Sequence, residues 1–402
     1  MWKKDIDIRE IKEIRVRTNV YFGVGAIAKI AEIVQQLKAR GVEKVIVVSG
    51  RGAYKTTGAW GVVENALKDA GIGYVNYDKV QPNPTTHQVD EAVSVARTFG
   101  ATAVIAIGGG SPIDAGKSVA ILLKYPEKTC TGLYTYAFTP TEAVPLVAIN
   151  LTHGTGTEAN RFAVVTIPEM DFKPAIAYDC IYPFASIDDP GLMTGLSAEQ
   201  TRFVSIDAVN HVVEAATAKT CSPYSISLAK EVIRMVAEFL PKALDNPQDL
   251  EARYYLTYAA LLAGVSFDNG LLHYTHALEH PLSAVKHDLS HGLGLAMLLP
   301  AVVKAIYAEK KNTLADIFAP IIKHEDLSAE AFAIRVEAWL ASVGVKEKLS
   351  DEGFTEADVP RLVELAFTTP SLGLLLSLAP NTSTRGVVEA IYRESLVPYA
   401  RA

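Results

Sequence analysis

Five of the nine histidines of this chain fall between positions 273 and 291. Three of them, His273, His276 and His280, are spaced by three and four residues, so they share one face if this stretch is helical. Upstream, Asp207 and His211 stand one helical turn apart. Imidazole nitrogens together with a carboxylate oxygen suit a divalent transition metal that keeps a position open for substrate. The sequence therefore indicates a metal centre built from two helices.

Each of these residues also has an ordinary explanation. A single histidine on a partly apolar helix is more often a hydrogen-bonded core residue than a ligand, and an isolated Asp-x-x-x-His pattern is common. The clustering favours metal binding, but spacing alone does not choose the ligands among His273, His276, His280 and His287.

Composition limits the kind of partner. Of the 402 residues 49% are hydrophobic, which is ample for a large core. A chain of this length is too long for one typical domain. A formal net charge of -7 argues against a nucleic-acid partner or an anionic membrane surface. Three widely spaced cysteines fit a reducing compartment, and the charged N-terminus lacks the apolar run of a signal peptide. We expect a soluble cytoplasmic protein with a small-molecule partner.

The first half of the chain alternates between two kinds of apolar pattern. Short β-branched runs predict strands at 14–22, 44–48, 73–77, 103–107 and 146–149, and helical spacing separates them at 27–37, 60–70 and 89–99. This alternation predicts an α/β domain with a doubly wound, mostly parallel sheet.

Beyond Pro190 the pattern becomes helical throughout. We therefore predict a nucleotide-binding α/β domain at 1–190 and an all-helical, metal-binding domain at 191–402. The expected helices of the second domain are 197–219, 223–244, 250–280, 292–308, 329–342, 356–367 and 384–399.

The strand predicted at 103–107 runs directly into a glycine-rich segment with signals for the start of a helix. Ser111 stands where an N-cap belongs and Asp114 three residues later, close to a capping box. Free amides at such a helix start would receive a phosphate lying against the glycines, although a plain strand-to-helix turn is the alternative. The candidate cofactor-binding residues are Gly108, Gly109, Gly110, Ser111, Asp114 and Lys117.

A second polar loop follows the strand predicted at 146–149. It is dense in hydroxyl groups and glycine, and Thr152 and Thr155 are candidate contacts to a ribose or nicotinamide. A polar surface turn explains the same residue types equally well. His153 in this loop has the same ambiguity and no obvious partner in the sequence.

Taken together, four motifs resemble the iron-containing, group III alcohol dehydrogenase family, namely those at 108–117 and 153–158, the Asp207 and His211 pair, and His276-x-x-x-His280 followed by His291-Gly. The resemblance implies a dehydroquinate synthase-like architecture and selects Asp207, His211, His276 and His291 as ligands of Fe2+, with Zn2+ as the alternative ion. It implies that His280 is a proton relay and that Asp114 holds the carboxamide of a nicotinamide. Two departures concern the pocket: the family usually has alanine at position 153, and the separation of His280 from His291 is one residue longer than in some members.

From these residues we expect a metal-dependent alcohol dehydrogenase or aldehyde reductase that acts on a small alcohol or aldehyde as a homo-oligomer, and specifically a homodimer. Gly50 stands where relatives that prefer NAD carry aspartate, and Arg51 can pair with a 2′-phosphate, so we expect NADP(H) to be preferred over NAD(H). Phe267 is either part of the substrate pocket or core. The alternatives are a dehydroquinate-synthase-like lyase, a glycerol-dehydrogenase-like enzyme and a non-catalytic nucleotide-binding protein.

Overall fold

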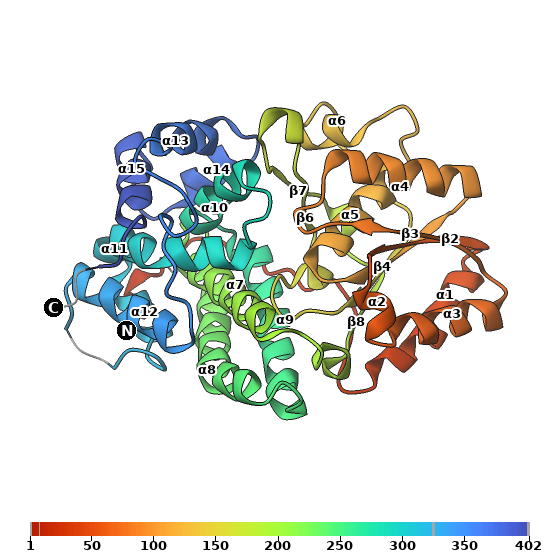
Figure 1. Ribbon diagram of the computed structural model, residues 1–402, viewed down its shortest axis with the longest axis horizontal. Helices are drawn as coiled ribbons and strands as arrows, with labels where there is room; N and C mark the ends of the chain where they lie inside the picture. Colours follow the sequence, from red (N-terminus) through yellow and green to blue (C-terminus); the bar gives the residue numbers. More distant parts are fainter. Residues whose placement is uncertain (1, 8, 324–325, 400–402) are drawn as a thin grey trace. The chain divides into compact units, whose positions relative to one another are not determined.

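The computed structural model describes residues 2–7, 9–323 and 326–399 (Figure 1). The chain divides into a helical unit, Met1–Arg15, Ser197–Asn246 and Leu262–Ala402, and an α/β unit, Val16–Leu196 and Pro247–Leu261. These ranges differ from the predicted 1–190 and 191–402 in three segments, the shortest of which, 191–196, belongs to the α/β unit. Residues 1–15 belong to the helical unit, and residues 247–261 belong to the α/β unit.

The α/β unit is organised around a parallel sheet. In the described part of the chain six strands pair in the order β1-β8-β5-β4-β2-β3, and every pairing within this sheet is parallel. This confirms the predicted doubly wound α/β fold. The strands are β1 (Val20–Phe22), β2 (Lys44–Gly50), β3 (Gly73–Val80), β4 (Ala103–Gly108), β5 (Leu146–Asn150) and β8 (Ala185–Asp188), and β6 (Phe162–Val164) and β7 (Ala175–Ala177) form a separate antiparallel pair.

Side chains of the central strands pack alternately into two hydrophobic cores, one on each face of the sheet, because successive side chains of a strand point to opposite faces. One face packs against α4 (Thr86–Phe99), α5 (Gly110–Leu122) and α6 (Cys130–Tyr134), and the other against α1 (Ile30–Ala39) and α3 (Ala59–Ala70) (Figure 1). The short helix α2 (Ala53–Thr56) follows β2. The predicted opening strand was too long, since only residues 20–22 pair with β8.

The strand order places a reversal of direction between β2 and β4. From β2 the chain moves outward to β3, crosses back to β4 and then continues to β5 and β8. In open α/β sheets ligands bind beyond the carboxyl ends of the strands at such a reversal. The segments at that edge are the turn after Gly50 and the glycine run that begins at Gly108.

The start of α5 corrects one prediction. The helix begins at Gly110 with Gly109 as its N-cap residue and no side-chain cap, so Ser111 is not the cap and there is no capping box with Asp114. By contrast, α4 has a true capping box, in which the side chains of Thr85 and Gln88 bond each other's backbone amides.

The helices predicted beyond residue 190 also differ from the structure at one important point. The expected helix 250–280 is two helices, α9 (Leu250–Gly270) and α10 (Tyr274–Val285), separated at Leu271, whose φ of 62° is left-handed. The other helices are α7 (Ala198–Thr217), α8 (Pro223–Asp245), α11 (His291–Ile317), α12 (Ala329–Ser342), α13 (Val359–Thr368), α14 (Leu372–Leu378) and α15 (Arg385–Glu394). The short 3-10 helices of both units are η1 (Trp2–Asp5), η2 (Ala26–Lys29), η3 (Thr157–Ala159), η4 (Pro168–Met170), η5 (Asp179–Ile181) and η6 (Pro190–Met193).

Helix α11 is long and apolar enough to cross a membrane by length and composition. However, 78% of its most apolar window is buried in the fold, as expected for a core helix.

Candidate metal centre and nucleotide site

Three helices of the helical unit present the candidate metal ligands. On α7, Asp207 and His211 lie one turn apart; α10 carries His276, and α11 begins with His291. The close packing of α11 on α7 depends on Gly292, because a Cβ there would lie 2.2 Å from the carbonyl oxygen of Phe203.

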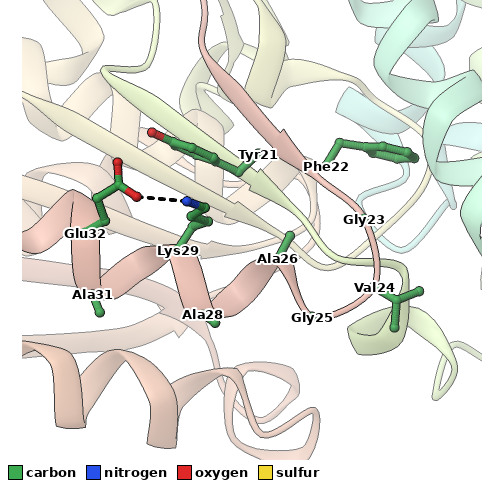
Figure 2. Close-up of a pocket in the computed structure, with 10 residues that line it drawn as sticks. All are labelled: Tyr21, Phe22, Gly23, Val24, Gly25, Ala26, Ala28, Lys29, Ala31 and Glu32. Atoms are coloured by element: carbon green, nitrogen blue, oxygen red, sulfur yellow. Dashed lines mark hydrogen bonds and ion pairs between the residues drawn. The ribbon is translucent and has the colours of Figure 1, made fainter.

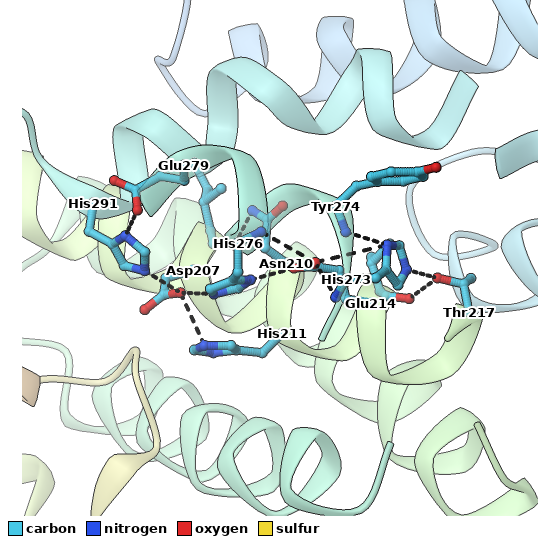
Figure 3. Close-up of polar contacts among 12 residues, drawn as sticks. Asp207, Asn210, His211, Glu214, Thr217, His273, Tyr274, His276, Glu279 and His291 are labelled. Carbon is cyan, nitrogen blue, oxygen red and sulfur yellow. Dashed lines mark hydrogen bonds and ion pairs between the residues drawn. The ribbon is translucent and has the colours of Figure 1, made fainter. Parts of the chain in front are cut away.

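The side chains of His211, His276 and His291 face Asp207 (Figure 3), and ligand atoms of three of the four candidates, Asp207, His276 and His291, lie within 4.8 Å of one another. The Nε2 atoms of His211, His276 and His291 lie 3.5, 3.6 and 4.0 Å from Oδ1 of Asp207. These separations exceed those of N–H···O hydrogen bonds, which are about 2.7–3.2 Å. The separations from His211 and His276 are close to the spacing of neighbouring ligands around one ion, since two atoms about 2.1 Å from a tetrahedral centre are about 3.4 Å apart, and the separation from His291 is longer.

Two of these ligand atoms are buried without a hydrogen bond to any described residue, which costs free energy unless another group, such as a metal ion, binds them. Oδ1 of Asp207 and Nε2 of His276 are buried and make no hydrogen bond within the described residues. Burial alone would raise the pKa of Asp207, but the surrounding histidines lower it to about 2. An anionic oxygen facing three ring nitrogens is a donor set that fits Fe2+ or Zn2+.

Two buried carboxylates that the sequence analysis missed support the candidate ligands. Glu214 contacts Nδ1 of His276, and Glu279 contacts Nδ1 of His291. Both carboxylates are fully buried. A histidine ligand commonly donates its second ring N–H to such a group, which orients the ring toward the metal. Spacing would have found Glu214, because it lies seven residues after Asp207 and so on the same helical face.

Ring stacking orients the remaining imidazole. His211 lies between the rings of His276 and Phe267, with ring centroids 4.6 and 4.5 Å away. Burial lowers the pKa of His211 to about 3, so the ring is neutral near pH 7. Phe267 is buried, and its contact with His211 places it beside the candidate metal centre.

The other histidines of the cluster separate in the structure. His280 is buried, and one of its ring nitrogens lies within 4.8 Å of ligand atoms of Glu279 and His291. His273 instead caps α10, with Nδ1 accepting from the amide of Tyr274 and Nε2 bonded to Thr217 Oγ1 at 2.8 Å. The expected stripe that included His273 is therefore wrong, because the helix is broken before it. His287 is exposed.

In the α/β unit, the glycines at 108–110 are in direct contact with the loop at 151–157, which carries Thr152 and Thr155 and is called the threonine loop below. A Cβ at Gly109 would lie 2.8 Å from the side chain of Thr152, and one at Gly110 would lie 2.6 Å from Thr155. A Cβ at Gly108 would lie 2.4 Å from Pro112, which requires glycine there too. The structure thus brings these predicted residues together at the carboxyl edge of β4 and β5.

Asp114 and Lys117 bond to protein groups instead. Asp114 accepts from Thr157 Oγ1 at 2.7 Å and from the amide of Val164 at 3.0 Å, and burial raises its pKa to about 6. Lys117 is fully buried, with Nζ 2.6 to 2.9 Å from oxygens of Thr157, Asn160 and Phe162. The expectation that Lys117 reaches a phosphate is therefore corrected, since its ammonium group instead fastens the following loop to α5.

The turn after β2 contains the predicted nucleotide-selecting residues. Gly50 ends the strand, and a Cβ there would lie 3.4 Å from the carbonyl oxygen of Val80, an ordinary contact. Arg51 is exposed. Position 50 therefore accepts an added Cβ, and a cationic side chain follows it in the sequence.

A hollow of about 560 Å³ lies beside η2, lined by ten residues between Tyr21 and Glu32 (Figure 2). Its backbone amides resemble an anion site, but Asp189 accepts from the amides of Gly25 and Ile27 at 3.0 and 3.1 Å. A carboxylate that caps these amides excludes a phosphate from them. The glycines at 23 and 25 are therefore a structural turn.

Known protein families and relatives match nearly the whole chain. Residues 17–190 match the model of the iron-containing alcohol dehydrogenases, and residues 202–396 match the C-terminal model of the same family. The long-chain primary alcohol dehydrogenase AdhA of Thermoanaerobacter ethanolicus is 56% identical over 398 residues, 98% of this chain and 100% of that protein. The 1,3-propanediol dehydrogenase of Citrobacter freundii is 35% identical over 86% of this chain and 90% of its own length.

Solved structures agree with the sequence relatives. The NADH-dependent butanol dehydrogenase A of Thermotoga maritima superimposes with a TM-score of 0.87 at 30% identity, over 96% of this chain and 99% of that one. A 1,3-propanediol oxidoreductase gives 0.86 at 31% identity, over 96% and 100% of the two chains. With both family models matched in order and a close relative spanning the full length, this chain belongs to the iron-containing alcohol dehydrogenase family.

Proposed function

We propose that this protein is a metal-dependent, NADP(H)-linked alcohol dehydrogenase that interconverts primary alcohols and aldehydes. The observation that carries the metal dependence is the convergence of three imidazole nitrogens on Oδ1 of Asp207, at separations suited to ligands of one ion. Family membership supplies the reaction class.

A longer primary alcohol is the substrate we favour. AdhA, which is 56% identical over its full length, is named for long-chain primary alcohols. The aromatic ring of Phe267 beside His211 adds an apolar surface next to the candidate metal centre, and such a surface suits an alkyl chain better than a second hydroxyl group.

The chain's own residues would act as follows. Asp207, His211, His276 and His291 would hold a divalent ion, which when bound polarises a carbonyl or stabilises an alkoxide. Glu214 and Glu279 hold the rings of His276 and His291 in orientation. His280 lies close to His291 and would move a proton between the substrate oxygen and solvent, a role suited to an imidazole.

The nicotinamide nucleotide would bind at the carboxyl edge of the sheet. The amides at the start of α5 would face its phosphates, and Thr152 and Thr155 would border it. One relative is named an NADH-dependent butanol dehydrogenase and another an NADPH-dependent butanol dehydrogenase, so family membership does not fix which nucleotide is used. The absence of a carboxylate at Gly50 and the exposed Arg51 support NADP(H).

Oxidation of NADPH with straight-chain aldehydes of increasing length tests the proposal. Protein loaded anaerobically with Fe2+ or with Zn2+ is compared with chelator-stripped protein and with the same protein after metal is added back. We expect turnover that requires metal, returns on reloading, and has higher kcat/KM for longer aldehydes. Full activity in protein shown to be metal-free contradicts the mechanism, and no oxidation of either nicotinamide nucleotide contradicts the function.

A further inference from the structure

A buried residue within the threonine loop, residues 151–157, contacts a distant part of the α/β unit. Thr152 and Thr155 in this loop pack against Gly109 and Gly110, where an added Cβ would approach them to within 2.8 and 2.6 Å. Between these two threonines lies His153, whose side chain is fully buried. The position of the loop relative to the glycines is set at Thr157 by its bonds with Lys117 and Asp114, and between the threonines by a contact of His153.

That contact is a guanidinium group. Nη1 of Arg253 lies 2.9 Å from Nε2 of His153, although the two residues are 100 positions apart. Arginine only donates, so Nε2 accepts and the proton of the neutral ring is on Nδ1. Burial, together with the charge of Arg253, lowers the pKa of His153 to about 3, so the ring remains an acceptor near neutral pH.

Arg253 is itself firmly placed. It lies in the first turn of α9, is fully buried, and its Nε donates to the carbonyl oxygen of Pro247 at 3.1 Å. Its Nη2 is 3.5 Å from the carbonyl oxygen of Leu196. A buried guanidinium group needs acceptors for its protons, so the acceptor on His153 stabilises both partners.

We infer that His153 is a positioning residue for the nicotinamide nucleotide: its bond to Arg253 holds the loop so that Thr152 and Thr155 close the side of the phosphate-binding glycines. This inference rests on the proposed binding of the nucleotide at that edge. It assigns His153 no contact with substrate or metal, since its side chain is buried against α9.

Three substitutions separate the hydrogen bond from simple packing. The amide oxygen of His153→Gln can still accept from Arg253, whereas His153→Leu keeps similar bulk without an acceptor. His153→Asn is polar but shorter, and it carries the test if the leucine variant does not fold. Binding of NADPH is measured by fluorescence titration without turnover, together with the metal content and the KM values for nucleotide and aldehyde.

We expect His153→Leu, and less strongly His153→Asn, to raise the Kd and KM for NADPH by about tenfold, the size expected for losing a buried hydrogen bond to a charged group. Metal content and the KM for aldehyde at saturating NADPH should stay unchanged, and His153→Gln should restore most of the nucleotide affinity. Equal nucleotide affinity in all the proteins, or a loss shared equally by nucleotide and aldehyde, overturns the inference. Failure of the wild-type protein to bind either nucleotide contradicts the proposed function instead.

Discussion

Glu214 holds His276 by contacting its Nδ1 atom, which leaves the opposite nitrogen, Nε2, directed at Asp207 (Figure 3). Oε1 of Glu214 also accepts from the amide of His273 at 2.8 Å, so the carboxylate is fixed on two sides. Burial alone would raise the pKa of Glu214, but His276 and His273 lower it to about 2. The group is therefore an anion that orients a candidate ligand.

Loss of this charge should weaken metal binding while leaving all four candidate ligands in place. Glu214→Gln keeps an acceptor for Nδ1 of His276 but removes the anion, and changes to such supporting groups typically cost about 10- to 100-fold in metal affinity. Competition with a chelator measures the affinity for Zn2+. Glu199→Gln, in the exposed first turn of the same helix, is the control and should bind like wild type. Wild-type affinity in Glu214→Gln contradicts the supporting role.

His280→Ala should keep its metal and its nucleotide affinity but lose rate. Removal of a general acid or base typically lowers the rate by about 100-fold or more, and His280 is one turn from the candidate ligand His276. Metal analysis and kcat measured on the same samples give the result. His276→Ala is the comparison and should lose the metal. If His280→Ala is purified without metal and His276→Ala retains it, the roles assigned to the two histidines must be exchanged.

Part of the site could be predicted because its residues lie on one helical face or directly after a strand. Asp207 and His211 share a turn of α7, and the glycines from 108 to 110 follow β4, so local spacing was sufficient for both. The choice of His276 and His291 came from a family resemblance. The helix break at Leu271 explains why spacing was insufficient, since it removes His273 from the stripe that periodicity suggests.

The rest depends on contacts between distant segments. Lys117 looked like a phosphate ligand because it follows a glycine-rich turn, yet it is bonded to residues 40 to 45 positions away. His153 showed no partner in the sequence, and its partner Arg253 is 100 residues away. Helix α14 was not among the predicted helices, because its short apolar run carries no helix-start signal.

Asp188→Asn should stabilise the protein at neutral and alkaline pH. Asp188 and Glu158 are both fully buried, and Oδ2 of Asp188 and both carboxylate oxygens of Glu158 make no hydrogen bond within the described residues. Burial raises the pKa of Asp188 to about 7, and burial together with Asp188 raises the pKa of Glu158 well above its usual value. The folded protein therefore holds a proton that the unfolded chain, with an aspartate pKa of about 3.9, releases earlier.

The sign of the pH effect follows from this difference. As pH rises from about 4 to about 7, the free energy of unfolding falls by the cost of ionising Asp188 in the folded state, and above pH 7 this loss is constant. Asparagine at position 188 does not ionise, so the variant does not undergo this fall in the free energy of unfolding. It can still accept the hydrogen bond from Asn150, which donates to Oδ1 of Asp188 at 2.9 Å. We expect its Tm to exceed that of wild type by roughly 2–4 °C at pH 8 and to approach it near pH 4. A Tm difference that is independent of pH contradicts the raised pKa.

The nucleotide preference should depend on the turn after β2. A carboxylate at position 50 would bond the ribose 2′-hydroxyl group of NAD(H) and repel the 2′-phosphate of NADP(H), whereas Arg51 offers paired donors to that phosphate. A Cβ at Gly50 meets only the carbonyl oxygen of Val80, at 3.4 Å, so the fold accepts the Cβ that aspartate adds. We expect wild type to prefer NADP(H), and Gly50→Asp combined with Arg51→Ala to shift the ratio of kcat/KM values toward NAD(H) without changing metal content. Gly50→Ala is the control for the added Cβ alone and should keep the wild-type ratio. A wild-type preference for NAD(H), or an unmoved ratio in the double variant, would show that another part of the chain recognises the 2′ position.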